Sequence, residues 1–231
     1  KSPNVIFADA VGTPDDLERV AKEAVASAFA NSGQDCCARS RVIVERAVYP
    51  QLVEALAAAA RARTIGDPQD PATEMGPLVS AGQRERTEGY VAAGRDEGAE
   101  WICGGERLDR PGYFLTPAVF AGGRPGMRLV EEEIFGPVAV VLPFDTEAEA
   151  IALANGTIYG LSGSLWTNDL KRGLRVARAI RTGVLSVNSS SSVHLQAPFG
   201  GCKQSGLGRE LGMRAMENYT EVRNLYFETN P

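Results

Sequence analysis

A helix, a turn and a strand are encoded in succession in TPDDLERVAKEAVASAFANSGQDCCARSRVIVE, residues 13–45. Thr13 can cap the amino end of the helix, Pro14 suits its first turn, and the two aspartates that follow favour the positive end of the helix dipole. Apolar residues then recur at helical spacing as far as Ala28. Asn31-Ser32-Gly33 predicts the end of the helix, and the alternating segment 40–45 predicts a strand.

This unit lies within a chain that continues to alternate strands and helices. Residues 1–10, KSPNVIFADA, predict a buried strand, and residues 189–208, rich in serine and glycine, predict a loop. Such alternation is typical of an α/β fold with a mostly parallel sheet flanked by helices. Further helices are predicted at about 51–62, 81–95, 146–154, 169–181 and 209–217, and further strands at 100–103, 113–120, 137–143, 161–166, 184–188 and 221–227.

The composition is that of a globular protein of one large domain or two small ones. The 231 residues are 44% hydrophobic and 23% charged, with a net charge of −5. The absence of a basic run argues against nucleic-acid binding, and no apolar stretch reaches the roughly 18 residues of a transmembrane helix. Four cysteines without zinc spacing and a single histidine predict no metal site. Free thiols indicate a reducing, cytoplasmic location.

Cys36 is the first candidate for chemistry. Its thiol lies on a glycine-bounded turn between a helix and a strand, where a backbone N–H can also face a reacting oxygen. A cysteine attacks only as the thiolate, so its site must lower the pKa of the thiol or supply a base. The alternative is that Cys36 and its neighbour Cys37 are small buried hydrophobic residues.

Two further segments are unspecific individually and indicate a function only when they are considered together with the Cys36 segment. Residues 131–137, EEEIFGP, place three acids before an apolar strand and could form a solvated turn. Residues 198–210, PFGGCKQSGLGRE, contain four glycines and a lysine, but their spacing matches neither GxGxxG nor a P-loop. The glycines favour a tight loop with a close backbone approach.

Together these segments resemble the aldehyde dehydrogenase family. The resemblance covers nearly the whole chain, and it rests on the order and spacing of motifs that are weak individually. It implies the C-terminal catalytic half of an NAD(P)-dependent aldehyde dehydrogenase. The motifs are NSGQDC (31–36), GDP (66–68), MGP (75–77), EEIFGPV (132–138), AN and YGL (154–155, 159–161), WTND (166–169), VN (187–188) and PFGGCKQSGLGRE (198–210), and the resemblance extends to YTEV (219–222).

The resemblance implies a role for each matched residue. Cys36 is the nucleophile of the family's GQxC pattern and its N–H an oxyanion donor, whereas Cys37 is structural. Glu133 hydrogen-bonds the nicotinamide ribose, and Phe135 packs near the nicotinamide. Asn188 fixes its loop and does not touch the substrate. The aldehyde entrance is lined by Ser191, Val193 and Phe199.

The implied reaction oxidises an aldehyde to a carboxylic acid. The Cys36 thiolate adds to the carbonyl carbon, the thiohemiacetal passes a hydride to NAD or NADP, and water activated by a carboxylate base hydrolyses the resulting thioester. The full-length protein is expected to be a homo-oligomer, a dimer or a tetramer. The aldehyde is not specified, although the serine-rich segment 189–194 has no aromatic cage and disfavours betaine aldehyde.

The chain is shorter than the family pattern. In the family, the general-base glutamate, the oxyanion asparagine and the Rossmann-type cofactor domain precede the segment that matches Lys1-Ser2-Pro3. We therefore expect an engineered truncation, a proteolytic fragment or a gene remnant, inactive or nearly so by itself. The expected division is a catalytic domain over 1–218 and an oligomerisation strand and tail over 219–231.

Three alternatives stay open. A non-catalytic binding or assembly module would keep the fold and bury an inert Cys36. A CoA-acylating aldehyde dehydrogenase would use a thiol acceptor where the hydrolytic enzyme uses water. A cysteine hydrolase would need a base beside Cys36, and His194, in a loop, is the one imidazole of the sequence.

Overall fold

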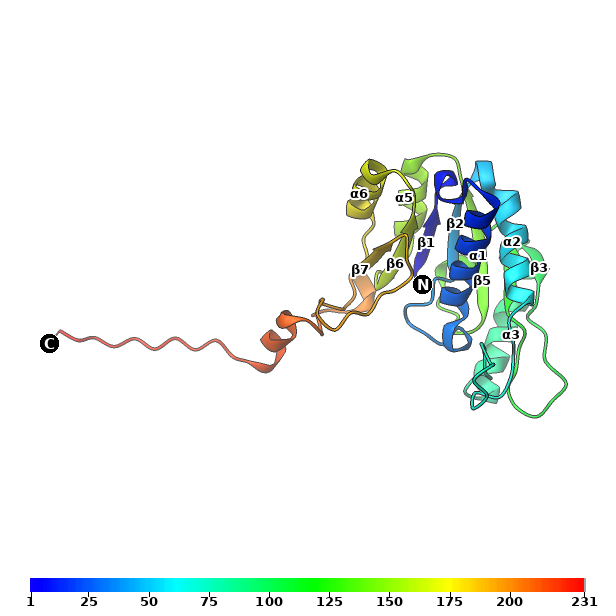
Figure 1. Ribbon diagram of the computed structural model, residues 1–231. Helices are drawn as coiled ribbons and strands as arrows, with labels where there is room; N and C mark the ends of the chain where they lie inside the picture. Colours follow the sequence, from blue (N-terminus) through cyan, green and yellow to red (C-terminus); the bar gives the residue numbers. More distant parts are fainter. Residues whose placement is uncertain (231) are drawn as a thin grey trace.

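A computed structural model describes residues 1–230 and shows seven strands in one sheet, in the order β3-β4-β5-β2-β1-β6-β7 (Figure 1). All neighbouring strands are parallel except β3 and β4, which are antiparallel. The predicted fold class, a mostly parallel α/β sheet flanked by helices, is confirmed. The strands are β1 (Pro3–Ile6), β2 (Arg41–Glu45), β3 (Glu100–Cys103), β4 (Ala118–Ala121), β5 (Val138–Phe144), β6 (Ser162–Trp166) and β7 (Val184–Val187).

Helices cover both faces of this sheet. The α-helices are α1 (Pro14–Phe29), α2 (Tyr49–Arg61), α3 (Ala81–Asp96), α4 (Arg128–Glu131), α5 (Glu147–Asn155) and α6 (Leu170–Ala179). Helices α1 and α2 pack on one face, and α3, α4, α5 and α6 on the other. Short 3₁₀ segments are η1 (Ala8–Val11), η2 (Ala30–Gly33), η3 (Arg46–Val48), η4 (Lys203–Ser205) and η5 (Met213–Tyr219).

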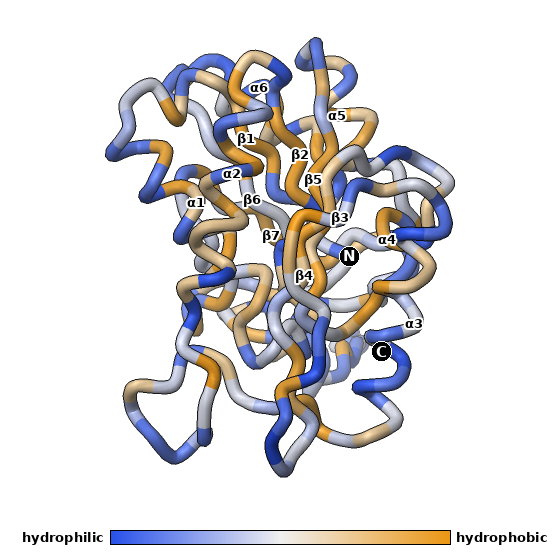
Figure 2. The backbone as a smooth tube through the Cα atoms, turned by 90° about the vertical axis from the view of Figure 1, so that its right-hand side faces the viewer, coloured by the Kyte–Doolittle hydropathy of each residue, from blue (hydrophilic) through white to orange (hydrophobic). Residues whose placement is uncertain are grey.

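The central strands are apolar on both faces because both faces are covered. In β2, Val42 and Val44 enter the core beneath α1 and α2, while Ile43 between them enters the opposite core. Such continuous hydrophobic strands are characteristic of parallel sheets with helices on both sides. Figure 2 shows the same hydrophobic band along β1, β2 and β5.

The start of α1 follows the predicted capping chemistry. The Thr13 hydroxyl accepts a hydrogen bond from the N–H of Asp16, and Pro14 occupies the first helical turn. At the other end, Asn31, Ser32 and Gly33 take left-handed φ angles of 49°, 60° and 71°, which break the helix as predicted. This break turns the chain toward β2 and creates the bend on which Cys36 lies.

Two predicted elements are shorter than expected. The strand predicted at 113–120 is confined to β4, Ala118–Ala121, because Pro117 has no N–H to donate to a neighbouring strand. The helix predicted at 209–217 is the 3₁₀ segment η5, and Leu211 and Gly212 just before it have left-handed φ angles of 60° and 59°. The short helix α4 was not predicted.

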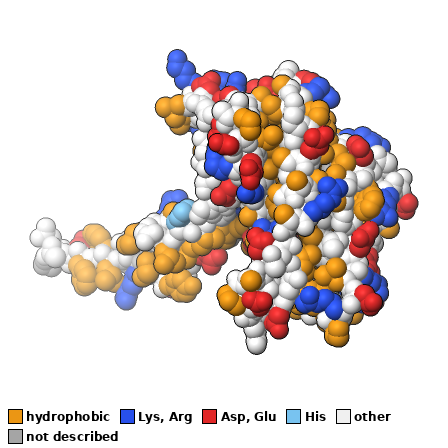
Figure 3. Space-filling model, turned by 45° about the vertical axis from the view of Figure 1, so that its right-hand side comes forward, with side chains coloured by type: hydrophobic (Ala, Val, Ile, Leu, Met, Phe, Trp, Pro, Cys, Tyr) orange, Lys and Arg blue, Asp and Glu red, His pale blue; other side chains and the backbone are white. Residues whose placement is uncertain are grey.

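The strand predicted at 221–227 is wrong for the described chain. Residues 220–230 form no backbone hydrogen bonds with the rest of residues 1–230, and a strand is defined by such bonds. They leave the sheet as an extended arm whose apolar side chains, including Tyr226 and Phe227, face solvent (Figure 3). Among residues 1–230, no helix combines the length and hydrophobicity needed to cross a lipid bilayer.

Candidate functional site

The turn between α1 and β2 is locked to two other loops by its own backbone and side chains. Ser32 Oγ donates to the carbonyl oxygen of Gly76 at 2.7 Å, and Gln34 Oε1 accepts from the N–H of Val79 at 2.9 Å. Gly33 packs so closely on Gly136 that an added Cβ would lie 2.2 Å from the Gly136 carbonyl oxygen. Three sequence motifs that are distant in the chain therefore meet at the turn that carries Cys36.

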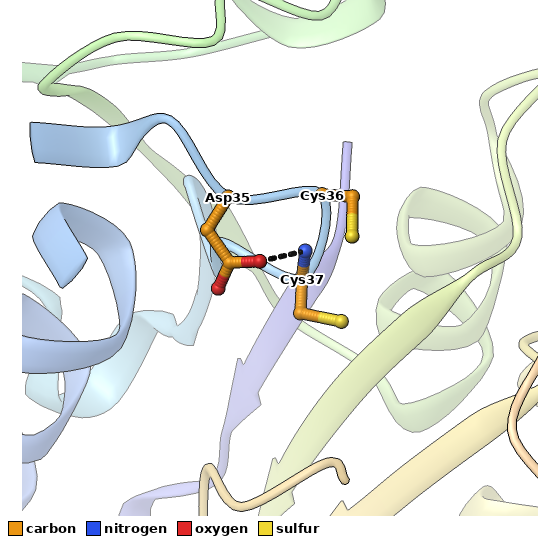
Figure 4. Close-up of side chains that lie close together, drawn as sticks. All are labelled: Asp35, Cys36 and Cys37. Atoms are coloured by element: carbon orange, nitrogen blue, oxygen red, sulfur yellow. Dashed lines mark hydrogen bonds between the residues drawn. The ribbon is translucent and has the colours of Figure 1, made fainter. Parts of the chain in front are cut away.

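The two adjacent cysteines occupy different environments. Cys36 is exposed and Cys37 is buried. The carboxylate of Asp35 accepts a hydrogen bond from the N–H of Cys37 at 2.9 Å, which closes the turn and leaves the Cys36 side chain on its outer side (Figure 4). The exposed Cys36 matches the predicted nucleophile, and the buried Cys37 matches the predicted structural neighbour. Their roles in catalysis stay predictions.

Asp35, Cys36 and Cys37 also form a potential ligand set. Their oxygen and sulfur atoms lie within 4.8 Å of one another. Thiolates and carboxylates can bind zinc, but here the Asp35 carboxylate already closes the turn. A cation held by these atoms would block the Cys36 thiol, so occupation of this set is incompatible with Cys36 acting as a nucleophile.

The surroundings of Cys36 disfavour its charged form. Partial burial of the thiol, followed by the neighbouring Cys37 and Asp35, raises the pKa of Cys36 to about 11. Nucleophilic attack near neutral pH therefore needs a base that removes the proton. Such a base must lie within reach of the Cys36 sulfur.

The raised pKa predicts the pH profile of Cys36 alkylation. Because only the thiolate reacts, the rate of iodoacetamide addition to this chain should rise about tenfold per pH unit from neutral pH and level off only near the pKa of Cys36, about 11. Asp35→Asn keeps an acceptor for the N–H of Cys37 but removes the charge, so the midpoint should move to lower pH. A plateau already at the ordinary thiol pKa of 9.0 would contradict the environment described here. Mass mapping of the labelled cysteine gives the measurement.

An open cavity of about 880 Å³ lies in front of Cys36. The structure brings Ser191, Val193 and Phe199 to its wall together with Cys36, although they are far apart in the sequence. Their assignment to the aldehyde entrance stays a prediction. The cavity is also lined by Glu23, Ala26, Ser27, Ala30, Asp35, Cys37, Arg39, Ser189, Ser190, Ser192, Glu210 and Leu211.

The serine segment of this wall is held in place from two sides. Residues 189–193 follow β7 and fold back along it, and Ser186 Oγ donates to the carbonyl oxygen of Ser191. At the start of the segment, Asn188 hydrogen-bonds both the N–H and the carbonyl of Thr167, at 3.0 and 2.9 Å. The prediction that Asn188 fixes its loop is confirmed.

The predicted cofactor residues lie on another side of Cys36. Glu133 and Phe135 line a small cavity that also includes Cys36. Side chains of α3 hold this loop: Gln83 Nε2 donates to the carbonyl oxygen of Phe135 at 2.6 Å, and Arg86 donates to that of Glu133 at 3.0 Å. Phe135 has a left-handed φ of 57° and is 40% exposed, so its ring is available for stacking.

Sequence reasoning missed three charged residues of the large cavity. Glu23 lies on α1, Glu210 pairs through its backbone with Phe199 at 2.7 and 2.8 Å, and Arg39 follows the cysteine turn. Glu23 could have been found, because residues 23, 26, 27 and 30 fall on one helical face that leads to the turn. Glu210 stands within the 198–210 motif, but only the Phe199–Glu210 pairing shows that it reaches the cavity.

Comparison with known proteins identifies the class that this fold and site define. The sequence model of the Aldehyde dehydrogenase family matches residues 1–225. The chain therefore belongs to the aldehyde dehydrogenase family, as its motifs predict.

Similar proteins include one curated relative compared by sequence and two solved structures that share the fold. Betaine aldehyde dehydrogenase of Bacillus subtilis is 43% identical over 235 residues, which cover 100% of this chain and 47% of that protein. The NAD+ complex of aldehyde dehydrogenase from Bacillus cereus has a TM-score of 0.94 at 45% identity, covering 100% of this chain and 46% of the other. An apo betaine aldehyde dehydrogenase variant from Staphylococcus aureus has a TM-score of 0.95 at 39% identity, with 100% and 46% coverage. The chain spans about half the length of the curated relatives it matches.

Proposed function

We propose that this chain is the nucleophile-bearing part of an enzyme that oxidises an aldehyde to a carboxylic acid, with Cys36 as the nucleophile and NAD+ as the hydride acceptor. The observation that carries the proposal is the exposed Cys36 thiol at a cavity of about 880 Å³, on a turn held by Ser32, Gly33 and Gln34. Membership of the aldehyde dehydrogenase family supports the chemistry.

The residues of the turn suit addition to a carbonyl group. The Cys36 sulfur bonds to the aldehyde carbon and yields a thiohemiacetal, whose oxygen becomes negative during the attack. The N–H of Cys36 donates to no acceptor within residues 1–230, so it is available to that oxygen. Loss of hydride from the carbon leaves a thioester on Cys36, and water releases the acid. Glu210 and Glu23 supply carboxylates in the same cavity that can accept protons.

Glu133 and Phe135 are the residues that fit a nicotinamide cofactor. The Glu133 carboxylate forms no hydrogen bond or ion pair within the described chain, so both oxygens can accept from ribose hydroxyl groups. The half-exposed Phe135 ring offers an apolar face to a planar ring. NAD+, when bound, accepts the hydride from the substrate carbon. The NAD+ complex of the Bacillus cereus relative supports NAD+ as the cofactor.

The substrate is proposed to be a short aliphatic aldehyde. Among residues 1–230, Phe199 is the one aromatic residue that lines the large cavity, and a quaternary ammonium group is typically enclosed by several rings. The relatives named betaine aldehyde dehydrogenase make betaine aldehyde the first competing substrate to test. We also propose that the full-length protein is a cytoplasmic homo-oligomer, with 1–218 as the catalytic domain and the exposed apolar side chains of residues 222–227 covered in the assembly.

The test is NADH formation from acetaldehyde and from betaine aldehyde. Since the chain spans about half of its relatives, we would compare it with a chimera that carries the first half of the Bacillus cereus aldehyde dehydrogenase ahead of Lys1. The chimera should form NADH from NAD+, and the chain alone should form little. A folded chimera without activity on either aldehyde would contradict the proposed function.

A further inference from the structure

Arg39 is a buried guanidinium at the wall of the large cavity, two residues beyond Cys37. It is only 1% exposed and lines the same cavity as Cys36. A buried arginine is costly unless its N–H groups find acceptors. The identity of those acceptors therefore shows what the side chain does in the fold.

The acceptors of Arg39 belong to three separate parts of the chain. In the cysteine turn, Nη1 donates to the carbonyl oxygen of Cys37. In β6, Nε donates to Ser164 Oγ at 2.9 Å. In the serine segment, Nη2 donates to Ser192 Oγ at 2.5 Å and to the carbonyl oxygen of Ser190 at 3.3 Å. One planar side chain thus connects the turn that bears the nucleophile with the serine segment that also lines the cavity.

These partners are all neutral. Within residues 1–230 no carboxylate lies within ion-pair distance of the Arg39 guanidinium. Burial accordingly lowers the pKa of Arg39 from its usual value. The planar guanidinium can donate to several neutral acceptors that lie in different fixed directions. The single ammonium group of a lysine cannot reproduce this geometry.

Few other side-chain hydrogen bonds hold Ser190 and Ser192 in place. Ser192 receives a second hydrogen bond from Ser162 Oγ at 3.1 Å, and Ser190 Oγ donates to Glu23 at 3.1 Å. Ser162 is buried in β6 and Glu23 lies on the cavity wall, and neither residue belongs to the cysteine turn. Arg39 is therefore the side chain that connects the turn and the serine segment directly.

We propose that Arg39 is a positioning residue, which fixes the turn of Cys36 against the serine segment 189–192 and so sets the width of the opening through which a substrate reaches the thiol. The inference rests on the proposed function, because it concerns access to the nucleophile. It predicts that Arg39 controls which reagents reach Cys36, in addition to any effect on stability.

The test compares how fast a small and a bulky thiol reagent label Cys36 in the full chain. Iodoacetamide and N-(1-pyrenyl)maleimide would be used, with mass mapping of the labelled cysteine. In the unaltered chain the opening should strongly favour the small reagent. Arg39→Lys should reduce the ratio of the small-reagent to the bulky-reagent rate about tenfold, as expected for loss of a hydrogen bond to a charged group. Ser192→Ala removes one acceptor and should change the ratio in the same direction by less.

Arg41→Lys is the matched control. Arg41 is equally buried at 1% exposure, but its guanidinium donates to the carbonyl oxygens of Lys1, Leu153 and Ala154, none of which belongs to the cysteine turn or lines the large cavity. The Arg41→Lys variant should unfold at a lower urea concentration, but the ratio of the small-reagent to the bulky-reagent labelling rate should not change. An unchanged ratio in both Arg39→Lys and Ser192→Ala overturns the inference, whereas an unreactive Cys36 in the unaltered chain overturns the proposed function and the inference with it. Ser192→Ala keeps the test valid if Arg39→Lys does not fold.

Discussion

Replacement of Cys36 by serine should reduce aldehyde oxidation by the chimera on the order of 10⁴-fold or more, as loss of a nucleophile does in enzymes with covalent intermediates. Serine has nearly the same shape, so the turn closed by Asp35 and Cys37 should persist. Its hydroxyl, however, is far less acidic than a thiol and is a poor nucleophile without a dedicated base. NADH formation at saturating aldehyde and NAD+ measures the effect.

Cys37→Ala is the control that separates the two adjacent cysteines. Cys37 is 7% exposed, and its contribution to the turn comes from its backbone N–H, which alanine retains. This variant should keep its turnover within about threefold and lose about 1 kcal/mol of unfolding free energy, as is usual for a small buried side chain. Activity in Cys36→Ser together with inactivity in Cys37→Ala would identify Cys37 as the nucleophile and contradict the role proposed for Cys36.

The sequence predicted the elements whose local pattern and tertiary environment agree. The cap at Thr13, the break at Asn31-Ser32-Gly33 and the alternation in β2 are local signals, and packing reinforces each of them. The motif resemblance predicted Cys36 as the nucleophile and Cys37 as its structural neighbour. The structure adds that Cys36 is exposed and Cys37 buried, on a turn that the Asp35 carboxylate closes at the backbone N–H of Cys37.

The rest depended on contacts between distant segments. Arg39 is an ordinary charged residue in the sequence, and its burial requires Ser164 and Ser192, more than 120 positions away. The strand expected at 221–227 has suitable alternation, but alternation alone cannot supply the neighbouring backbone that a strand requires. Local sequence patterns therefore predict the turn that carries Cys36. The position of the serine segment in the same cavity depends on contacts between distant residues, which the sequence alone does not show.

Gly33→Ala should cost about 3 kcal/mol or more of unfolding free energy, the sum of a left-handed backbone penalty and overpacking against a rigid neighbour. Gly33 has a φ of 71°, and its added Cβ would lie 2.2 Å from the Gly136 carbonyl oxygen and 2.4 Å from its carbonyl carbon. Backbone atoms cannot rotate away as a flexible side chain can. The turn of Cys36 or the loop of Glu133 and Phe135 must therefore move, and the rate of Cys36 alkylation should change as well.

Gly122→Ala is the control without the steric clash, so its comparison with Gly33→Ala isolates the steric part of the destabilisation. Gly122 has nearly the same φ angle, 67°, but nothing lies within 4 Å of its added Cβ. It should lose only about 1 kcal/mol, the cost of placing alanine in the left-handed region, and leave Cys36 alkylation unchanged. Urea unfolding of both variants gives the comparison. Equal losses would show that the contact between Gly33 and Gly136 is not tight, and that the cysteine turn is not held by the loop that carries the proposed cofactor residues.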